Sequence, residues 1–108
     1  MADKMLSFAA FWPFYLSQHA DPRTRAMHYC GTVLGSLLAI CFVFTKDWAI
    51  LAAALAAGYG PAWAAHAFIE RNRPATFTYP IWSFCADFRM LYFAATGRLA
   101  SELARTAR

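Results

Sequence analysis

Residues 26–69 read AMHYCGTVLGSLLAICFVFTKDWAILAAALAAGYGPAWAAHAFI and decide the fold. Apart from cysteine and tyrosine, the run 26–45 contains His28 as its one ionisable side chain, and the run 48–69 contains His66. At about 1.5 Å per helical residue, each run is long enough to cross a bilayer core of roughly 30 Å. We therefore expect transmembrane helices over 26–45 and 48–70.

The two runs are joined by the polar pair Lys46-Asp47, which predicts a helical hairpin. Counting from this pair, His28 lies about 18 residues back and His66 about 20 residues forward. The two positions along the helix axes then differ by only roughly 3 Å. The sequence therefore predicts both imidazoles at one membrane face, where they could share one site.

The composition favours an integral membrane protein with an all-α fold. Of the 108 residues, 60% are hydrophobic and only 15% are charged, which leaves too much apolar surface for an ordinary small soluble domain. No repeat or low-complexity linker divides the chain, so we expect a single membrane domain over 1–108. A cleaved secretory signal is not expected, because Pro13, Gln18 and His19 interrupt the apolar N-terminal stretch.

The net charge of +4 is concentrated on one side of the predicted hairpin. The arginines that flank it are Arg23, Arg25, Arg71, Arg73, Arg89, Arg98, Arg105 and Arg108. By the positive-inside rule both termini face the cytoplasm. The basic character suits an anionic lipid surface and requires no nucleic acid partner. The many alanines and arginines and the short length indicate a bacterial inner membrane.

An aromatic-rich segment precedes the first span. Helical spacing of its aromatic residues predicts an interfacial helix over 5–18, capped by Ser7 and kinked or restarted at Pro13. The break Ala20-Asp21-Pro22 ends this helix, because proline lacks an amide proton and disfavours helix in the residue before it. We expect this break to let His19 fold back towards His28.

Two further helices follow the hairpin. A third apolar helix is expected over 80–97, but Asp87 and Arg89 in its middle make a simple span unlikely at bilayer depth. It is expected to lie obliquely against the hairpin, and whether it fully spans stays open. The stretch 98–108 reads as a basic amphipathic tail at the interface.

Small residues recur every four positions in both predicted spans. They are Gly31, Gly35 and Ala39 in the first, and Ala52, Ala56 and Gly60, or Ala53 and Ala57, in the second. Such faces allow close helix approach in lipid. Contact within the chain explains them better than a homodimer, which stays an alternative. Three cysteines, Cys30, Cys41 and Cys85, are expected to be buried reduced thiols, because they lie far apart in apolar sequence.

The candidate metal ligands are His19, His28, His66 and Glu70. We expect these four side chains to converge at one membrane boundary. A single histidine of this kind more often forms a hydrogen bond in a protein core, but ionisable groups in apolar runs are commonly functional. Imidazole and carboxylate ligands suit iron and zinc, and a site with open positions can activate O₂ on ferrous iron. Glu70 could be a ligand, accept a ring proton of a ligating histidine or pair with Arg73.

Other polar residues could support this site. Asp87 is a weaker candidate for the same work, since a salt bridge to a neighbouring arginine explains it more simply, and Tyr15 is expected to support the ligands with it. Arg73, Arg23 or Arg25 could orient a carboxylate, although each is also explained as a topogenic or headgroup charge. Asn72 is expected to shape the loop after Glu70 with Pro74, or to hydrogen-bond a substrate in catalysis.

Several motifs in fixed order connect these residues. They are FY at 14–15, HADP at 19–22, HYCGT at 28–32, HAFIERNRPA at 66–75 and DFRM at 87–90. The chain resembles, over roughly 14–97, the membrane-bound 2-hydroxy-fatty-acid (2-hydroxy-palmitate) dioxygenase family, formerly a domain of unknown function. Relatives commonly have asparagine in place of Asp21 and Thr24, and glycine in place of Ala65. Characterised eukaryotic members are longer and have a further histidine between the two motif blocks.

The resemblance implies an Fe(II)- and O₂-dependent dioxygenase of fatty-acid α-oxidation, which shortens a 2-hydroxy fatty acid by one carbon. The metal would chelate the hydroxyl and carboxylate of the substrate while its tail lies among apolar side chains. Two alternatives stay open from the residues alone. One is a non-catalytic membrane protein that binds lipid or acts as a scaffold, and the other is a lipid hydrolase that uses Zn(2+) in place of Fe(2+).

Overall fold

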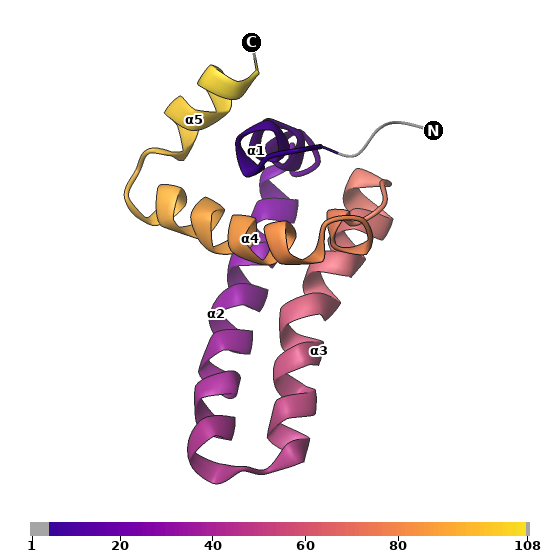
Figure 1. Ribbon diagram of the computed structural model, residues 1–108, viewed down its shortest axis with the longest axis vertical. Helices are drawn as coiled ribbons and strands as arrows, with labels where there is room; N and C mark the ends of the chain where they lie inside the picture. Colours follow the sequence, from indigo (N-terminus) through magenta and orange to yellow (C-terminus); the bar gives the residue numbers. More distant parts are fainter. Residues whose placement is uncertain (1–4, 108) are drawn as a thin grey trace. The chain divides into compact units, whose positions relative to one another are not determined.

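The computed structural model describes residues 5–107 of the chain, and this part is all helical, as the sequence predicts (Figure 1). The helices are α1 Phe8–Ser17, α2 Pro22–Thr45, α3 Trp48–Ala65, the π-helix η1 His66–Glu70, the 3-10 helix η2 Ala75–Phe77, α4 Pro80–Ala95 and α5 Leu99–Thr106. They form two compact units. One comprises Met1–Ala20 and Ala75–Arg108, and the other, the hairpin unit, comprises Asp21–Pro74. A single membrane domain over 1–108 stays a prediction.

Helices α2 and α3 form the predicted hairpin and run antiparallel, side by side (Figure 1). Asp21 caps α2 by accepting a hydrogen bond from the Arg23 amide at 2.8 Å. At the turn, Lys46 adopts a left-handed conformation with φ 55°, and Asp47 accepts a hydrogen bond from the Ala49 amide at 3.0 Å to begin α3. The capping residues therefore set both helix starts.

Two glycines on α2 allow α3 to approach closely. A Cβ atom added to Gly31 would lie 2.9 Å from the carbonyl oxygen of Ala57, and one added to Gly35 would lie 3.1 Å from that of Ala54. Both distances are shorter than ordinary carbon to oxygen contacts, so a side chain here would push the helices apart. The expected contact within the chain is confirmed for Gly31 and Gly35. On α3 their neighbours are Ala54, Ala57 and Gly58, so of the small residues expected there only Ala57 is among them, and a Cβ atom at Gly60 would meet nothing within 4 Å.

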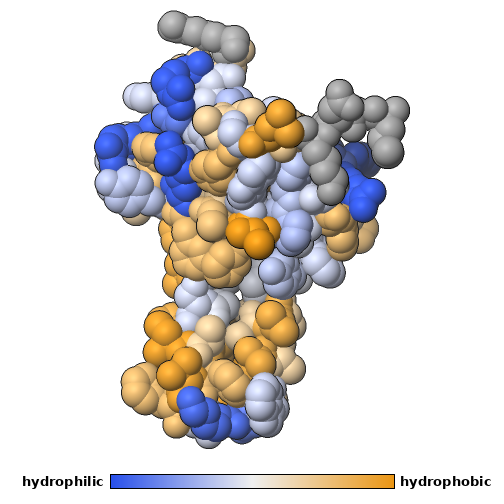
Figure 2. Space-filling view, in the orientation of Figure 1, coloured by the Kyte–Doolittle hydropathy of each residue, from blue (hydrophilic) through white to orange (hydrophobic). Residues whose placement is uncertain are grey.

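The hairpin unit exposes its apolar side chains. Both α2 and the segment Trp48–Glu70 are long and apolar enough to cross a membrane, yet only 17% of each apolar window is buried inside the protein. The core helix of a soluble protein would be mostly buried. Figure 2 shows apolar residues over much of the hairpin on this face, with a hydrophilic patch at its tip. By length and composition these are two candidate membrane spans.

The three cysteines, Cys30, Cys41 and Cys85, are exposed, so the expectation that they are buried is wrong. It assumed that apolar sequence packs inside the protein. In the hairpin unit, where Cys30 and Cys41 lie on α2, much of the apolar surface instead points outward.

In the other unit, α1 begins at Ser7, whose hydroxyl accepts a hydrogen bond from the Ala10 amide at 3.1 Å, as predicted. The helix runs without a restart through Pro13. It packs on the beginning of α4, where the Phe11 ring lies 5.1 Å from the Tyr79 ring and 5.7 Å from the Trp82 ring, centroid to centroid. Contacts between tilted aromatic rings therefore join two segments far apart in the sequence.

The C-terminal helix α5 is held against α1 by a buried carboxylate. Glu102 accepts a hydrogen bond from the Trp12 indole at 2.7 Å and pairs with Arg105. The Arg105 guanidinium is the main cause that lowers the pKa of Glu102, and the Trp12 hydrogen bond acts in the same direction. Helix α4, with 16 residues, is not among the two candidate spans of the described chain.

Candidate metal centre

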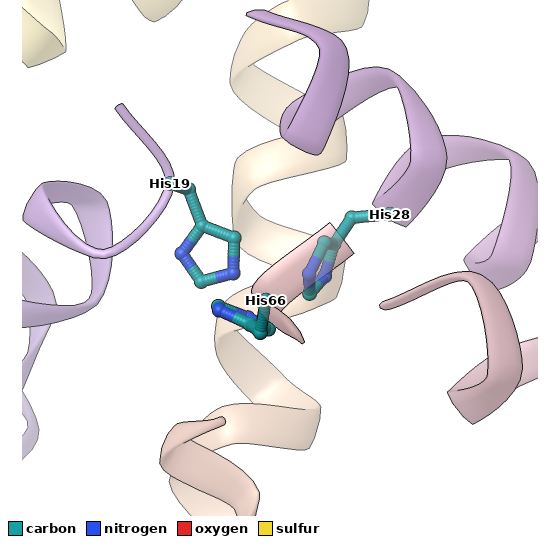
Figure 3. Close-up of side chains that lie close together, drawn as sticks. All are labelled: His19, His28 and His66. Carbon is teal, nitrogen blue, oxygen red and sulfur yellow. The ribbon is translucent and has the colours of Figure 1, made fainter. Parts of the chain in front are cut away.

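The hairpin brings two buried histidines together at one end. His28 lies on α2 and His66 begins η1, and their rings meet edge to face with centroids 5.2 Å apart and an interplanar angle of 88° (Figure 3). Their side chains are only 5% and 2% exposed. The predicted pairing of these two imidazoles at a common end of the hairpin is therefore confirmed.

Asn72 fixes the tautomer of His66. The Nδ1 atom of His66 lies 2.6 Å from the Oδ1 atom of Asn72. An amide oxygen can only accept a hydrogen bond, so Nδ1 of His66 carries the proton and donates it. In the neutral ring the lone pair is then on Nε2, the arrangement typical of a metal-binding histidine whose other nitrogen is held by the protein.

The loop that carries Asn72 folds back because the helix ends in a π-turn. The carbonyl oxygen of His66 accepts hydrogen bonds from the amides of Arg71 and Asn72, the second at 3.0 Å. Arg71 adopts a left-handed conformation with φ 57°, which is uncommon for a residue other than glycine. Single π-turns are frequent at functional sites. The predicted role of Asn72 in shaping the loop did not include this contact with His66.

Glu70 connects the end of the second predicted span to the start of the first. Its Oε2 atom accepts a hydrogen bond from the backbone amide of Asp21 at 2.8 Å. Two ends of the hairpin unit that are distant in sequence are thereby held together next to His66. A role of Glu70 as a metal ligand stays a prediction.

His19 belongs to the unit that contains α1, and a contact within that unit fixes it in the same tautomer as His66. It is 1% exposed, and its Nδ1 atom lies 2.6 Å from the carbonyl oxygen of Tyr15, which can only accept. Nε2 of the neutral ring again has the lone pair. The Tyr15 ring stacks on the His19 ring at 4.1 Å, and the Tyr15 hydroxyl donates a hydrogen bond to Asp87. Tyr15 thus orients His19, and Asp87 holds Tyr15.

Thr24 is a buried polar residue near His28 that the sequence analysis did not name as a site residue. It lies one helical turn before His28, is fully buried, and its hydroxyl has no hydrogen-bond partner among the described residues. A buried hydroxyl without a partner costs about 1–3 kcal/mol. This polar atom, one turn from a histidine, fits a site that holds a polar ligand. The spacing of four from His28 was the available signal.

The arginines predicted to bind substrate differ in their surroundings. Arg23 pairs with Asp21 at 2.8 Å, and this guanidinium is the main cause that lowers the pKa of Asp21 to about 2. Arg73 lines a surface depression together with Ala67, Phe68, Arg71 and Asn72. Arg25 is half-buried on α2. A carboxylate-binding role for any of the three stays a prediction.

These observations define a small helical protein with an apolar hairpin and histidines whose tautomers are fixed by the surrounding chain. The family model described as 2-hydroxy-palmitic acid dioxygenase Mpo1-like matches residues 5–99, and the chain belongs to this family. Searches of curated proteins and of solved structures returned no match.

Proposed function

We propose that the protein is an Fe(II)- and O₂-dependent dioxygenase that shortens 2-hydroxy fatty acids by one carbon. Membership of the Mpo1-like family supports a dioxygenase acting on such a lipid. The observation that carries the proposal is the pair of buried histidines, of which His66 is held by Asn72 with its Nε2 lone pair available. A histidine that binds a metal typically has its other ring nitrogen held by such a hydrogen bond.

The ligands we propose are His19, His28 and His66, all of them buried, with Glu70 as a further oxygen donor. Chain connectivity supports the inclusion of His19. Consecutive Cα atoms are about 3.8 Å apart, so the Cα of His19 lies at most about 8 Å from that of Asp21. The amide of Asp21 is hydrogen-bonded to Glu70, four residues after His66. Nitrogen and carboxylate donors together suit iron or zinc.

When bound, iron would supply Lewis acidity towards the hydroxyl and carboxylate of the substrate and the means to activate O₂. The chain supplies orientation and binding. Asn72 and the Tyr15 carbonyl hold the protons of His66 and His19 on Nδ1, so that Nε2 is directed as the donor. In this proposal the guanidinium of Arg73, which lines the surface depression with Asn72, would bind the substrate carboxylate, and the exposed ring of Phe68 would contact the adjoining acyl chain.

We further propose that the protein is integral to a membrane, with both termini in the cytoplasm and, in a bacterium, in the inner membrane. The outward-facing apolar surface of the two candidate spans supports insertion. The flanking arginines support the orientation. A 2-hydroxy fatty acid is itself amphiphilic, so a site at the end of the hairpin would meet its polar head at the membrane boundary.

Elemental analysis after anaerobic purification tests the metal. Stoichiometric iron, with O₂ uptake and release of an acid one carbon shorter on addition of 2-hydroxypalmitate, is the expected result. Stoichiometric zinc would indicate a hydrolase, and a folded protein without metal would indicate a lipid-binding scaffold. Either of these results would contradict the proposal.

A variant pair tests the ligand assignment. His66→Ala should abolish iron uptake while the helical circular dichroism is retained, because the ring contributes a ligand but the hairpin is held by α2 and α3. The matched control is Phe44→Ala, which removes an 81% exposed side chain at the other end of the hairpin and should bind iron normally. Full iron occupancy in His66→Ala would refute the assignment.

A further inference from the structure

Helix α4 has an apolar face that no other part of the described chain covers. The face consists of Ile81, Phe84, Phe88 and Tyr92, which are 76%, 57%, 41% and 56% exposed. Spacings of three, four and four residues place these side chains in one stripe along the helix. The opposite side is formed by the buried residues Ser83, Ala86 and Met90. α4 therefore has one face packed on its own unit and one apolar face directed outward.

Two guanidinium groups border this stripe and are held by aromatic rings. The Arg98 guanidinium lies 5.0 Å from the centroid of the Tyr92 ring and donates a hydrogen bond to the Tyr92 hydroxyl at 2.6 Å. The Arg89 guanidinium lies 4.9 Å from the Trp12 ring and 5.0 Å from the Phe93 ring. Neither arginine forms a direct ion pair with a carboxylate in the described part of the chain. Arg89 lies near enough to Glu102 to help lower the pKa of that carboxyl, so Arg98 is the charge that is most available to an external anion.

We propose that α4 lies in the plane of a phospholipid bilayer surface, with its apolar stripe towards the acyl chains and with Arg89 and Arg98 at the lipid phosphates. Its 16 residues give a length of about 24 Å, which is short of the roughly 30 Å bilayer core. An apolar face bordered by arginine and tyrosine is typical of helices that enter a bilayer by about 5–10 Å.

The bilayer is favoured over a second protein as the occupant of this surface. The same chain contains two candidate membrane spans, so a lipid bilayer would be available to α4, which follows them in the sequence. Burial of the stripe against an apolar protein surface would also remove the Arg98 guanidinium from water without a counterion, which is costly. Lipid phosphates supply that counterion at the depth where the apolar stripe ends.

The native thiol of Cys85, which is exposed and adjacent to Phe84 on α4, permits a direct test. In a Cys30→Ser, Cys41→Ser background, Cys85 of the full-length protein is labelled with an environment-sensitive fluorophore and the protein is placed in lipid nanodiscs. The lipids carry bromine either near the headgroup or near the bilayer centre. Headgroup-proximal bromine should quench the label about twofold more strongly than central bromine.

Two labelled controls bracket the measurement. A label at Leu34→Cys, with all three native cysteines replaced by serine, should be quenched more by the central bromine, since Leu34 is 52% exposed and lies near the middle of the candidate span α2. The same fluorophore attached to glutathione, free in solution, should be quenched little by either lipid and strongly by aqueous iodide. The experiment requires neither metal nor activity, so its result is independent of the proposed reaction.

Two outcomes would overturn the proposal. Strong iodide quenching at Cys85 without bromine quenching would show that the stripe faces water. Rapid disulfide formation between Cys85 residues of two chains of the unlabelled protein when copper phenanthroline and air are added as oxidant, together with no bromine quenching in the labelled protein, would show that a second copy covers it. The double variant Phe84→Ser, Phe88→Ser should reduce the headgroup-proximal quenching at Cys85 by about half, because it removes the apolar contact with lipid. An unchanged depth in this variant would also count against the proposal.

Discussion

Asn72 is the residue on which the orientation of His66 depends, and it can be tested without touching a proposed ligand. Asn72→Leu removes the acceptor of the His66 Nδ1 proton. Loss of such an acceptor typically weakens metal affinity by roughly 10- to 100-fold. We expect a decrease of this size in iron affinity, measured by competition with a chromogenic chelator.

The matched control for this residue is Asn72→Asp, which keeps an acceptor oxygen at the same position. It should retain most of the iron affinity, since a carboxylate oxygen also accepts the Nδ1 proton. Equal iron affinities for Asn72→Leu and the unmodified protein would show that the contact has no role in metal binding.

Asp21 should contribute a pH-dependent part of the stability. Its pKa is lowered from 3.8 to about 2, mainly by the hydrogen bond with Arg23. Because the folded pKa lies below the unfolded value, the stabilisation is complete above 3.8 and is lost as the pH falls towards about 2. In detergent, thermal unfolding between these pH values should depend less on pH in Asp21→Asn. An identical pH dependence would exclude a contribution from this carboxylate.

At single residues, the sequence predicts which side chains could bind a metal better than it predicts the hydrogen bonds that hold them. His28 and His66 could be paired in advance, because the charge-free runs and the Lys46-Asp47 turn fix their height along the hairpin. The contact of Asn72 with His66 could not be foreseen in the same way. It depends on the π-turn and on the left-handed backbone of Arg71, and neither has a hydrophobic periodicity that a sequence reveals.

At the scale of the helices, the hairpin depends on close contact between α2 and α3. Gly31→Ala would place a Cβ atom 2.9 Å from the carbonyl oxygen of Ala57, so the backbones must separate. Overpacking of this kind costs about 1–3 kcal/mol. We expect a loss of this size in the free energy of unfolding, measured by titration with a denaturing detergent.

Gly60→Ala is the control for this packing, because a Cβ atom at Gly60 meets nothing within 4 Å. Alanine also has a higher helix propensity than glycine, by up to about 1 kcal/mol, so this variant should be neutral or slightly more stable. If Gly31→Ala behaved like Gly60→Ala, the helices would not be in the close contact described for α2 and α3.

Element bounds were largely predictable, and the exceptions have physical causes. The turn at Lys46-Asp47 and the helix ends at Thr45 and Glu70 follow from polar residues and proline in the sequence. Helix α2 begins at Pro22, four residues before the predicted start at 26, because Asp21 and Pro22 form a capped first turn that includes Arg23 and Arg25. The prediction followed the uncharged run and therefore began too late.

At the scale of the whole molecule, the outward-facing apolar surface of the hairpin should keep the protein in the membrane fraction and out of the aqueous fraction. The two candidate spans bury only 17% of their apolar windows inside the protein, so the remainder requires lipid or detergent. After expression, the chain should stay in the membrane pellet during alkaline carbonate extraction and be released by detergent. Recovery of folded monomer in the carbonate supernatant would contradict membrane insertion.

The π-turn at His66–Glu70 has a consequence for evolution, because the turn can form only if this segment keeps its present number of residues. Deleting the 80% exposed Phe68 would leave one residue fewer between His66 and Asn72, so the wide turn, with its hydrogen bonds from the Arg71 and Asn72 amides to the His66 carbonyl, could not form as it is. Asn72 would then lose the backbone position from which its side chain holds the imidazole. We expect such a shortened protein to keep its helical circular dichroism but lose iron, so insertions and deletions in this lineage should be tolerated at the hairpin tip and eliminated here.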